Sequence, residues 1–295
     1  MTSGSPSLRA YRGSMSHHDD EIHEHDLGLS HDLPTVLNRR RALGLMSAAG
    51  LAAALAACSG GGGSDGSSST SSRPGGGPPS SSSVDVADDE IPEETGGPYP
   101  ADGTNGVNVL TESGIVRSDI TTSFGTASGV AAGVPMSLDL TIYDMNGSAV
   151  APLAGAAIYV WHCDREGRYS MYDQGVAEEN FLRGVQVTDS AGKVSFSSIF
   201  PAAYSGRWPH VHFEVYPSEA DATSATNKLR TSQLALPEDA CTAVYATAGY
   251  EQSVSNMQQT TLDSDNVFSD GYSLQLAKAT GSAAGGYTVS LNISV

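Results

Sequence analysis

The segment YSGRWPHVHF, residues 204–213, places a tyrosine, an arginine and two histidines within ten positions. Side chains on an extended strand alternate between its two faces. His210 and His212 therefore leave one face of such a strand, while Val211 and Phe213 leave the other. The segment predicts a strand that puts apolar side chains into a core and two imidazole rings at a shared position.

Short runs of alternating apolar and polar residues recur along the chain, separated by turns rich in Gly, Asn and Asp. Such runs are typical of strands. Their frequency predicts an all-β fold, a β-sandwich of mostly antiparallel strands with short helices and long loops. One helix is expected around Pro237–Ala246. The expected strands are Met136–Asp144, Ala156–Cys163, Lys193–Ile199, His210–Tyr216 and Tyr287–Val295.

The N-terminal part of the chain has the pattern of an export signal. Three arginines, Arg39–Arg41, precede an apolar run, Ala42–Ala57, that is too short to span a bilayer comfortably. Paired arginines indicate the twin-arginine route, and the ending Leu-Ala-Ala-Cys is similar to a lipoprotein cleavage site that leaves Cys58 lipidated. We expect a signal peptide over residues 1–57 and a protein lipid-anchored at the extracytoplasmic face of a bacterial membrane. The alternative is an uncleaved anchor helix.

A Gly- and Ser-rich stretch follows the signal and has too few apolar residues to form a core. We assign residues 58–92 to the lipidated cysteine and a flexible tether, and residues 93–295 to one folded domain. The formal net charge of −18 argues against nucleic-acid binding, which requires a basic face. The sequence contains no phosphate-binding glycine loop and no Gly-x-Ser-x-Gly elbow, so nucleotide-binding and serine-hydrolase classes have no support.

The positions of the cysteines and histidines limit the kinds of site that the domain can contain. An even pair of cysteines outside the cytoplasm, Cys163 and Cys241, predicts a disulfide; two buried free thiols or a metal site are the alternatives. The folded domain holds three histidines, two of them in a His-x-His pair that can aim both rings at one metal ion. By itself the pair is equally consistent with ordinary hydrogen-bonded residues. The third, His162, is expected to be a core or supporting histidine.

The neighbours of the histidine pair favour a metal site. The segments VWHCDREGRYSMYD (160–173) and FPAAYSGRWPHVHF (200–213) together resemble the intradiol ring-cleavage dioxygenases, the family of the catechol and protocatechuate dioxygenases. The shared pattern is a strand with a tryptophan, a turn to Gly-x-Tyr, a second tyrosine, and then Arg-x-x-His-x-His. The matching residues are Trp161, Gly167-Arg168-Tyr169, Tyr204, Arg207, His210 and His212. The segment EETGGPYP (93–100) is similar to the family's Gly-Pro-Tyr segment.

The resemblance implies a non-haem Fe(III) dioxygenase that uses O2 to cleave catecholic rings between the two hydroxylated carbons, giving muconate-type diacids. Its implied iron ligands are Tyr169, Tyr204, His210 and His212, and Tyr204 would also act as general base. Arg207 would hold positive charge beside the ring and Gln233 would line the same pocket. Tyr99 is the expected substrate-binding wall. Tyr172 is an alternative ligand to Tyr169, but the Gly-x-Tyr match favours Tyr169.

Two other functions remain open at this level. One is a non-catalytic, lipid-tethered binding module whose histidine pair is structural or holds zinc. The other is a cupin-like metal oxygenase, for which Glu214, the next same-face residue after His212, would be the carboxylate ligand. The substrate preference and the oligomeric state are left open, because the helical dimerisation segment of cytoplasmic catechol dioxygenases has no counterpart here.

Overall fold

The computed structural model describes residues 89–146 and 149–295. The predicted signal peptide of residues 1–57, the lipidation site Cys58 and nearly all of the predicted tether lie outside the described residues. Within the described part, no helix is long and apolar enough to cross a bilayer. The fold below concerns this part alone.

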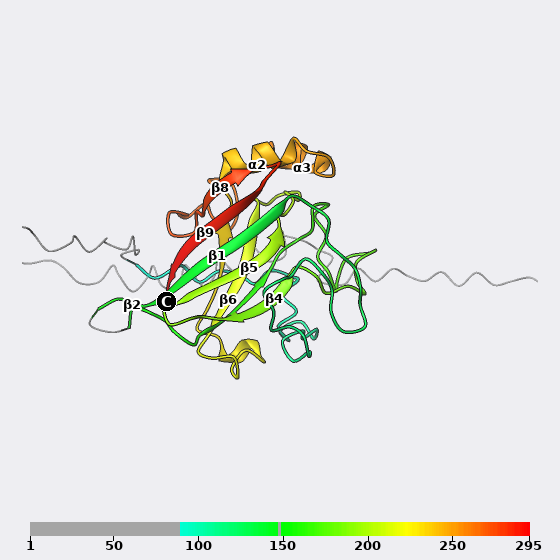
Figure 1. Cartoon of the computed structure of the whole chain (residues 1–295). Coiled ribbons are helices and arrows are strands. Elements are labelled where there is room, and N and C mark those ends of the chain that lie inside the picture. The colour runs from blue at the N-terminus through cyan, green and yellow to red at the C-terminus, as the bar shows by residue number, and fades with distance from the viewer. Residues whose placement is uncertain (1–88, 147–148) are drawn as a thin grey trace, which may run out of the picture. The chain divides into compact units, whose positions relative to one another are not determined.

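Two β-sheets build the domain (Figure 1). In the first sheet, β1 pairs with the antiparallel strand β5 on one side and with the parallel strand β9 on the other, and β8 lies beyond β9. The short strand β2 pairs with the end of β1. The strands are β1 Pro135–Asp144, β2 Ala151–Pro152, β5 Lys193–Ile199, β8 Lys278–Ser282 and β9 Gly286–Ser294.

The second sheet is antiparallel throughout, in the order β4-β3-β6-β7. Its strands are β3 Ala157–Trp161, β4 Arg183–Val187, β6 His210–Tyr216 and β7 Arg230–Ala235. The remaining elements are the 3-10 helix η2 Ala225–Asn227 and the helices α2 Glu238–Tyr245 and α3 Glu251–Met257. The two α-helices lie together at one end of the first sheet in Figure 1. The prediction of an all-β fold with mostly antiparallel strands is confirmed.

The main hydrophobic core lies between the two sheets and follows from strand alternation. Leu138 and Leu140 of β1 enter this core together with Val211 and Phe213 of β6. Burying such side chains removes about 25 cal/mol of unfavourable hydration per Å² of apolar surface. Apolar contact between the sheets therefore fixes the register of β6 and aims its alternate residues away from the core.

The opposite face of the second sheet is also covered, and this face carries the histidines. A second apolar cluster packs there, in which Tyr159 and Trp161 of β3 contact residues from the segments before β1 and after β3. Long loops thus bury a sheet face that would be exposed in a simple sandwich. All seven residues of β6 are buried as a result.

The predicted disulfide between Cys163 and Cys241 is wrong, because both cysteines are free and buried. Cys163 packs in the cluster on the loop-covered face, while Cys241 packs in the main core beside Val244. The Cys163 thiol donates to the carbonyl oxygen of Ala202, 3.6 Å away. Each thiol thus packs among its own set of neighbours, and no disulfide joins the two.

Candidate metal centre

The two histidines of β6 occupy neighbouring positions on the loop-covered face of the second sheet. His212 lies directly opposite Trp161 of β3 and Gln233 of β7. The rings of Trp161 and His212 stack, with centroids 4.8 Å apart and planes 5° apart. Cross-strand pairing therefore fixes the plane of the His212 ring, which a loop position would leave free.

The ring of His210 is oriented by a main-chain hydrogen bond. Its Nδ1 atom lies 2.5 Å from the carbonyl oxygen of Trp208, which can only accept, so Nδ1 carries the proton. The Nε2 atom of His210 consequently presents a lone pair, 3.1 Å from Nε2 of His212. Metal-binding histidines have this arrangement, with one ring nitrogen held by an acceptor and the other free to bind.

Tyr169 lies in a tight turn after β3. Asp164 closes this turn by accepting hydrogen bonds from the backbone N–H groups of Glu166 and Arg168 and from the Arg168 guanidinium. Gly167 adopts a φ of +87° there, and a Cβ atom at this position would lie 3.3 Å from the Cβ atom of Tyr204. A glycine is thus required for the close approach of the two tyrosine segments.

Four donor atoms converge where these segments meet. The phenol oxygens of Tyr169 and Tyr204 are 3.4 Å apart, and the Tyr204 oxygen is 3.1 Å from Nε2 of His210. With the 3.1 Å between the two Nε2 atoms, every consecutive pair has the separation expected of ligands that share one ion through bonds of about 2 Å. No group of three or more His, Cys, Asp or Glu in the described residues could hold a metal, so a site here needs the tyrosines.

Burial keeps all four groups uncharged in the absence of an ion. Burial, and then the neighbouring Tyr204 phenol, hold the pKa of Tyr169 well above its usual range, and burial raises the pKa of Tyr204 to about 12. Burial, reinforced by the positive charge of Arg207, lowers the pKa of His210 to about 3. Burial and the adjacent His210 hold the pKa of His212 well below its ordinary value. Neutral imidazole is the form that binds metals, and a cation would favour the phenolate forms of the tyrosines.

One atom at this centre has no protein partner. Nδ1 of His212 is buried and forms no hydrogen bond with the described residues. A buried polar atom of this kind is uncommon in folded proteins. With a metal ion on Nε2, this Nδ1 atom would carry the ring proton, and the donor set of two phenol oxygens and two imidazoles suits a hard trivalent iron.

The four groups differ in accessibility. Tyr169, His210 and His212 are buried, whereas Tyr204 is half-buried and precedes the exposed turn Ser205-Gly206. Three donors are therefore fully enclosed, and the fourth is partly accessible to solvent.

Arg207 and Gln233 meet beside the histidines. Nη2 of Arg207 donates to Oε1 of Gln233 over 2.6 Å, and Nε2 of Gln233 donates to the carbonyl oxygen of Thr95 over 2.9 Å. The structure adds a residue that sequence reasoning missed: Asp265 accepts a hydrogen bond from Nε of Arg207 over 2.9 Å. No local pattern marks Asp265, because its partner is far away in the sequence.

The Gly-Pro-Tyr segment packs against the centre. The ring of Tyr99 lies 4.9 Å from that of Tyr169 and 5.2 Å from that of Tyr172. A Cβ atom on Gly97 would come within 3.4 Å of Cε1 of His212, so this glycine allows the backbone to approach the imidazole closely. The alternative ligand Tyr172 points elsewhere: its hydroxyl donates to Oδ1 of Asn105 and accepts from the backbone N–H of Ala101.

Two other candidates are committed to separate networks. Both ring nitrogens of His162 are hydrogen-bonded, to the Cys163 carbonyl oxygen and to the Ser198 hydroxyl, so it is a core histidine. The carboxylate of Glu214 accepts from the Tyr216 hydroxyl and from Nζ of Lys228. Since both carboxylate oxygens of Glu214 are engaged in this way, the described residues offer the cupin-like arrangement no carboxylate ligand.

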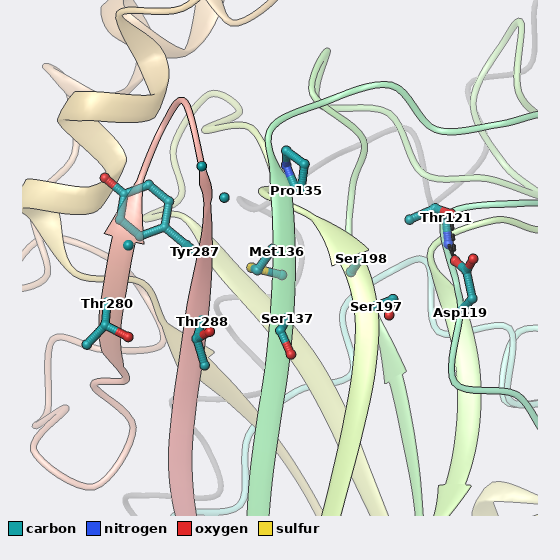
Figure 2. Close-up of a pocket in the computed structure, with 13 residues that line it drawn as sticks. Asp119, Thr121, Pro135, Met136, Ser137, Ser197, Ser198, Thr280, Tyr287 and Thr288 are labelled. Carbon is teal, nitrogen blue, oxygen red and sulfur yellow. Dashed lines mark hydrogen bonds between the residues drawn. The ribbon is translucent and has the colours of Figure 1, made fainter.

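A groove of about 620 Å³ lies elsewhere, on the outer face of the first sheet (Figure 2). Ser137, Ser197 and Thr288 line it with hydroxyl groups, and Asp119 at its side accepts hydrogen bonds from Thr121. None of the predicted site residues lines this groove.

Comparison with known proteins agrees with the fold and with these motifs. Residues 114–245 match the family model Dioxygenase_C, described as dioxygenase. The chain is 43% identical over 54 residues to catechol 1,2-dioxygenase 2 of Acinetobacter lwoffii (18% of this chain, 19% of that protein). It is 38% identical over 53 residues to chlorocatechol 1,2-dioxygenase of Rhodococcus opacus (18% and 21%). The matched segments span about a fifth of the length of these curated relatives.

A solved structure extends the likeness over most of a domain. The intradiol ring-cleavage dioxygenase from Tetranychus urticae aligns with a TM-score of 0.50 at 25% identity, covering 62% of this chain and 87% of that one. The fold and the motifs are therefore similar to those of the intradiol ring-cleavage dioxygenases, and the dioxygenase family model covers residues 114–245 of this chain.

Proposed function

We propose that this protein is a non-haem Fe(III) intradiol dioxygenase that acts on catecholic aromatics. The observation that carries the proposal is the convergence of two phenol oxygens and two imidazole nitrogens, with consecutive separations of 3.4, 3.1 and 3.1 Å. Family members use non-haem Fe(III), and Tyr169, Tyr204, His210 and His212 would hold it. Bound Fe(III) would supply the Lewis acidity that activates a catechol towards O2.

Three residues of the protein would have separate roles in the reaction. Tyr204 is the half-buried donor, so its phenol oxygen is the one suited to accept a proton from a catechol hydroxyl. Tyr169 would keep its place, because its backbone N–H is bonded to Oδ2 of Asp173 over 2.6 Å and its ring is buried. Arg207 would stabilise negative charge that develops on the ring during oxygen attack.

The overall reaction balances without a further reductant. The bond between the two hydroxylated carbons breaks, and both atoms of O2 enter the product, so that catechol and O2 give a cis,cis-muconate-type diacid. The catechol is oxidised and O2 is reduced in the same step sequence. Cleavage beside the hydroxylated carbons would give a semialdehyde instead.

The test is oxygen uptake by the iron-loaded protein with a panel of catechols, read together with the ultraviolet spectrum of the product. We expect muconate-type products, and a tyrosinate-to-iron absorption band in the resting protein. Tyr204→Phe should weaken that band and lower kcat, whereas the matched variant Tyr172→Phe should retain both. A colourless zinc protein with no oxygen uptake would refute the proposal in favour of a binding module, and a semialdehyde product would refute intradiol cleavage.

The exported, lipid-anchored state belongs to the same proposal and rests on residues 1–58. A protein anchored outside the cytoplasm would meet catechols supplied by its surroundings. Membrane fractionation of cells that express the wild type or Cys58→Ala tests this part separately, because loss of the anchor should release the protein without changing its oxygen uptake.

A further inference from the structure

We propose that Asp265 is a positioning residue of this centre, one that sets the direction of the Arg207 guanidinium and holds the main chain leading to His210. The inference rests on the proposed function, since it concerns the same catechol-cleaving site. Asp265 lies outside residues 114–245, which match the family model. No sequence motif singles it out.

The Asp265 carboxylate is completely buried and fully used. Its Oδ2 atom accepts from Nε of Arg207 over 2.9 Å and from the backbone N–H of Trp208 over 2.7 Å. Its Oδ1 atom accepts from the backbone N–H groups of Val267 and Phe268 over 2.8 and 3.3 Å. The hydrogen bonds to Oδ1 from its own turn therefore fix the orientation of the carboxylate independently of its contacts with Arg207 and Trp208. The carboxylate can in turn fix the orientation of these two residues.

Two bonds determine where the Arg207 guanidinium faces. Asp265 accepts a hydrogen bond from Nε of Arg207, and Gln233 accepts one from Nη2. Because the guanidinium is planar and rigid, these two bonds also fix the direction in which Nη1 points. Nη1 donates to no residue that the structure describes. We assign Nη1 as the hydrogen-bond donor left for the reacting ring, aimed by the carboxylate on one side and the amide on the other.

The same carboxylate oxygen also restrains the path to His210. Trp208 is held at its backbone N–H by Asp265 and at its indole Nε1–H by the carbonyl oxygen of Leu236. The Trp208 carbonyl oxygen in turn accepts from Nδ1 of His210. Asp265 is thus linked to the centre by two routes, one through Arg207 and one through Trp208 and His210.

A purely structural role would be the neutralisation of a buried arginine, and a double-variant comparison separates the two roles. We would compare Asp265→Asn, Asp265→Glu and the exposed neighbour variant Asp263→Asn in the wild type and in an Arg207→Ala background. The readouts are kcat and KM for catechol, retention of iron against a chelator, and the thermal midpoint. Asp263→Asn should behave as the wild type in all of them.

We expect Asp265→Asn to lower kcat about 10- to 100-fold, with KM changed less than about 3-fold, as is typical when a residue that orients a site is altered. In the Arg207→Ala background, assayed with saturating iron, the same change should have no further effect on kcat, because the effect of Asp265 on turnover passes through the guanidinium. Iron retention should fall about 10-fold in both backgrounds, since that route runs through Trp208. Asp265→Glu keeps the charge and should recover iron retention better than it recovers kcat.

Three results would overturn the proposal: a kcat for Asp265→Asn within about twofold of wild type, losses that multiply in the double variant, or iron retention equal to wild type. If Asp265→Asn does not fold, Asp265→Glu carries the same comparison, because the buried charge is retained. A wild-type protein that binds iron but consumes no O2 would refute the proposed function alone. The iron-retention series would still test the role of Asp265 in that case.

Discussion

Gly167 holds the Tyr169 turn against Tyr204, and Gly167→Ala tests how tightly the two segments fit. The residue has a φ of +87°, a conformation that costs a non-glycine residue about 1–2 kcal/mol. The added methyl group would also lie 3.3 Å from the Cβ atom of Tyr204, and overpacking of such a close contact, here between half-buried residues, costs about 1–3 kcal/mol. The free energy of unfolding should therefore fall by about 2–5 kcal/mol.

Gly155→Ala provides the matched control. Gly155 has a φ of +80°, but nothing lies within 4 Å of a Cβ atom placed there. This variant should lose only the conformational part, about 1–2 kcal/mol. Urea unfolding of both proteins, analysed by linear extrapolation, gives the two values. Equal losses would mean that Gly167 does not bring the two tyrosines together, and unchanged iron retention by Gly167→Ala would refute the link from this turn to the centre.

Two further predictions concern buried charge. Arg183 is fully buried and donates to Ser170, the Pro100 carbonyl oxygen and the Tyr159 hydroxyl, with no carboxylate partner among the described residues. Arg183→Met should cost about 2–4 kcal/mol in urea unfolding, and a loss no larger than that of Arg230→Met, at a partly exposed ion pair, would contradict this. Burial lowers the pKa of His162 from an ordinary 6.5 to about 4. The unfolded chain then binds the proton more readily than the folded one, so the free energy of unfolding should fall by up to about 3 kcal/mol as the pH drops from 6.5 towards 4. For His162→Gln the free energy of unfolding should decline less steeply over this range. Equal slopes for the two proteins would contradict a lowered pKa of His162.

Hydrophobic alternation located most of the sandwich correctly. The expected strand over Lys193–Ile199 agrees with β5, that over His210–Tyr216 agrees with β6, and the helix expected around Pro237–Ala246 is α2. The strand β7 was missed because its sequence, RTSQLA, is mostly polar although nearly all of it is buried. Thr231 and Gln233 form hydrogen bonds to Glu214 and Arg207, respectively, and such pairing is set by tertiary neighbours that a periodicity cannot reveal.

The centre was only partly accessible from the sequence. Motifs indicate the residues that converge, and their roles as iron ligands stay predictions: Tyr169, Tyr204, His210 and His212. The motifs did not reveal Asp265, which meets Arg207 only through the fold. The disulfide prediction failed because counting cysteines says nothing about which cluster each side chain enters.

The parallel pairing of β1 with β9 has a consequence for biosynthesis. The strand β9 lies between β1 and β8, and its pairing with β1 joins residues far apart in sequence, such as Leu138 and Val289. The backbone N–H of Ile91, near the start of the segment that leads to Tyr99, also donates to the carbonyl oxygen of Ser294. The chain must therefore be synthesised as far as β9 before either contact can form, and long-range pairings of this kind make folding slow.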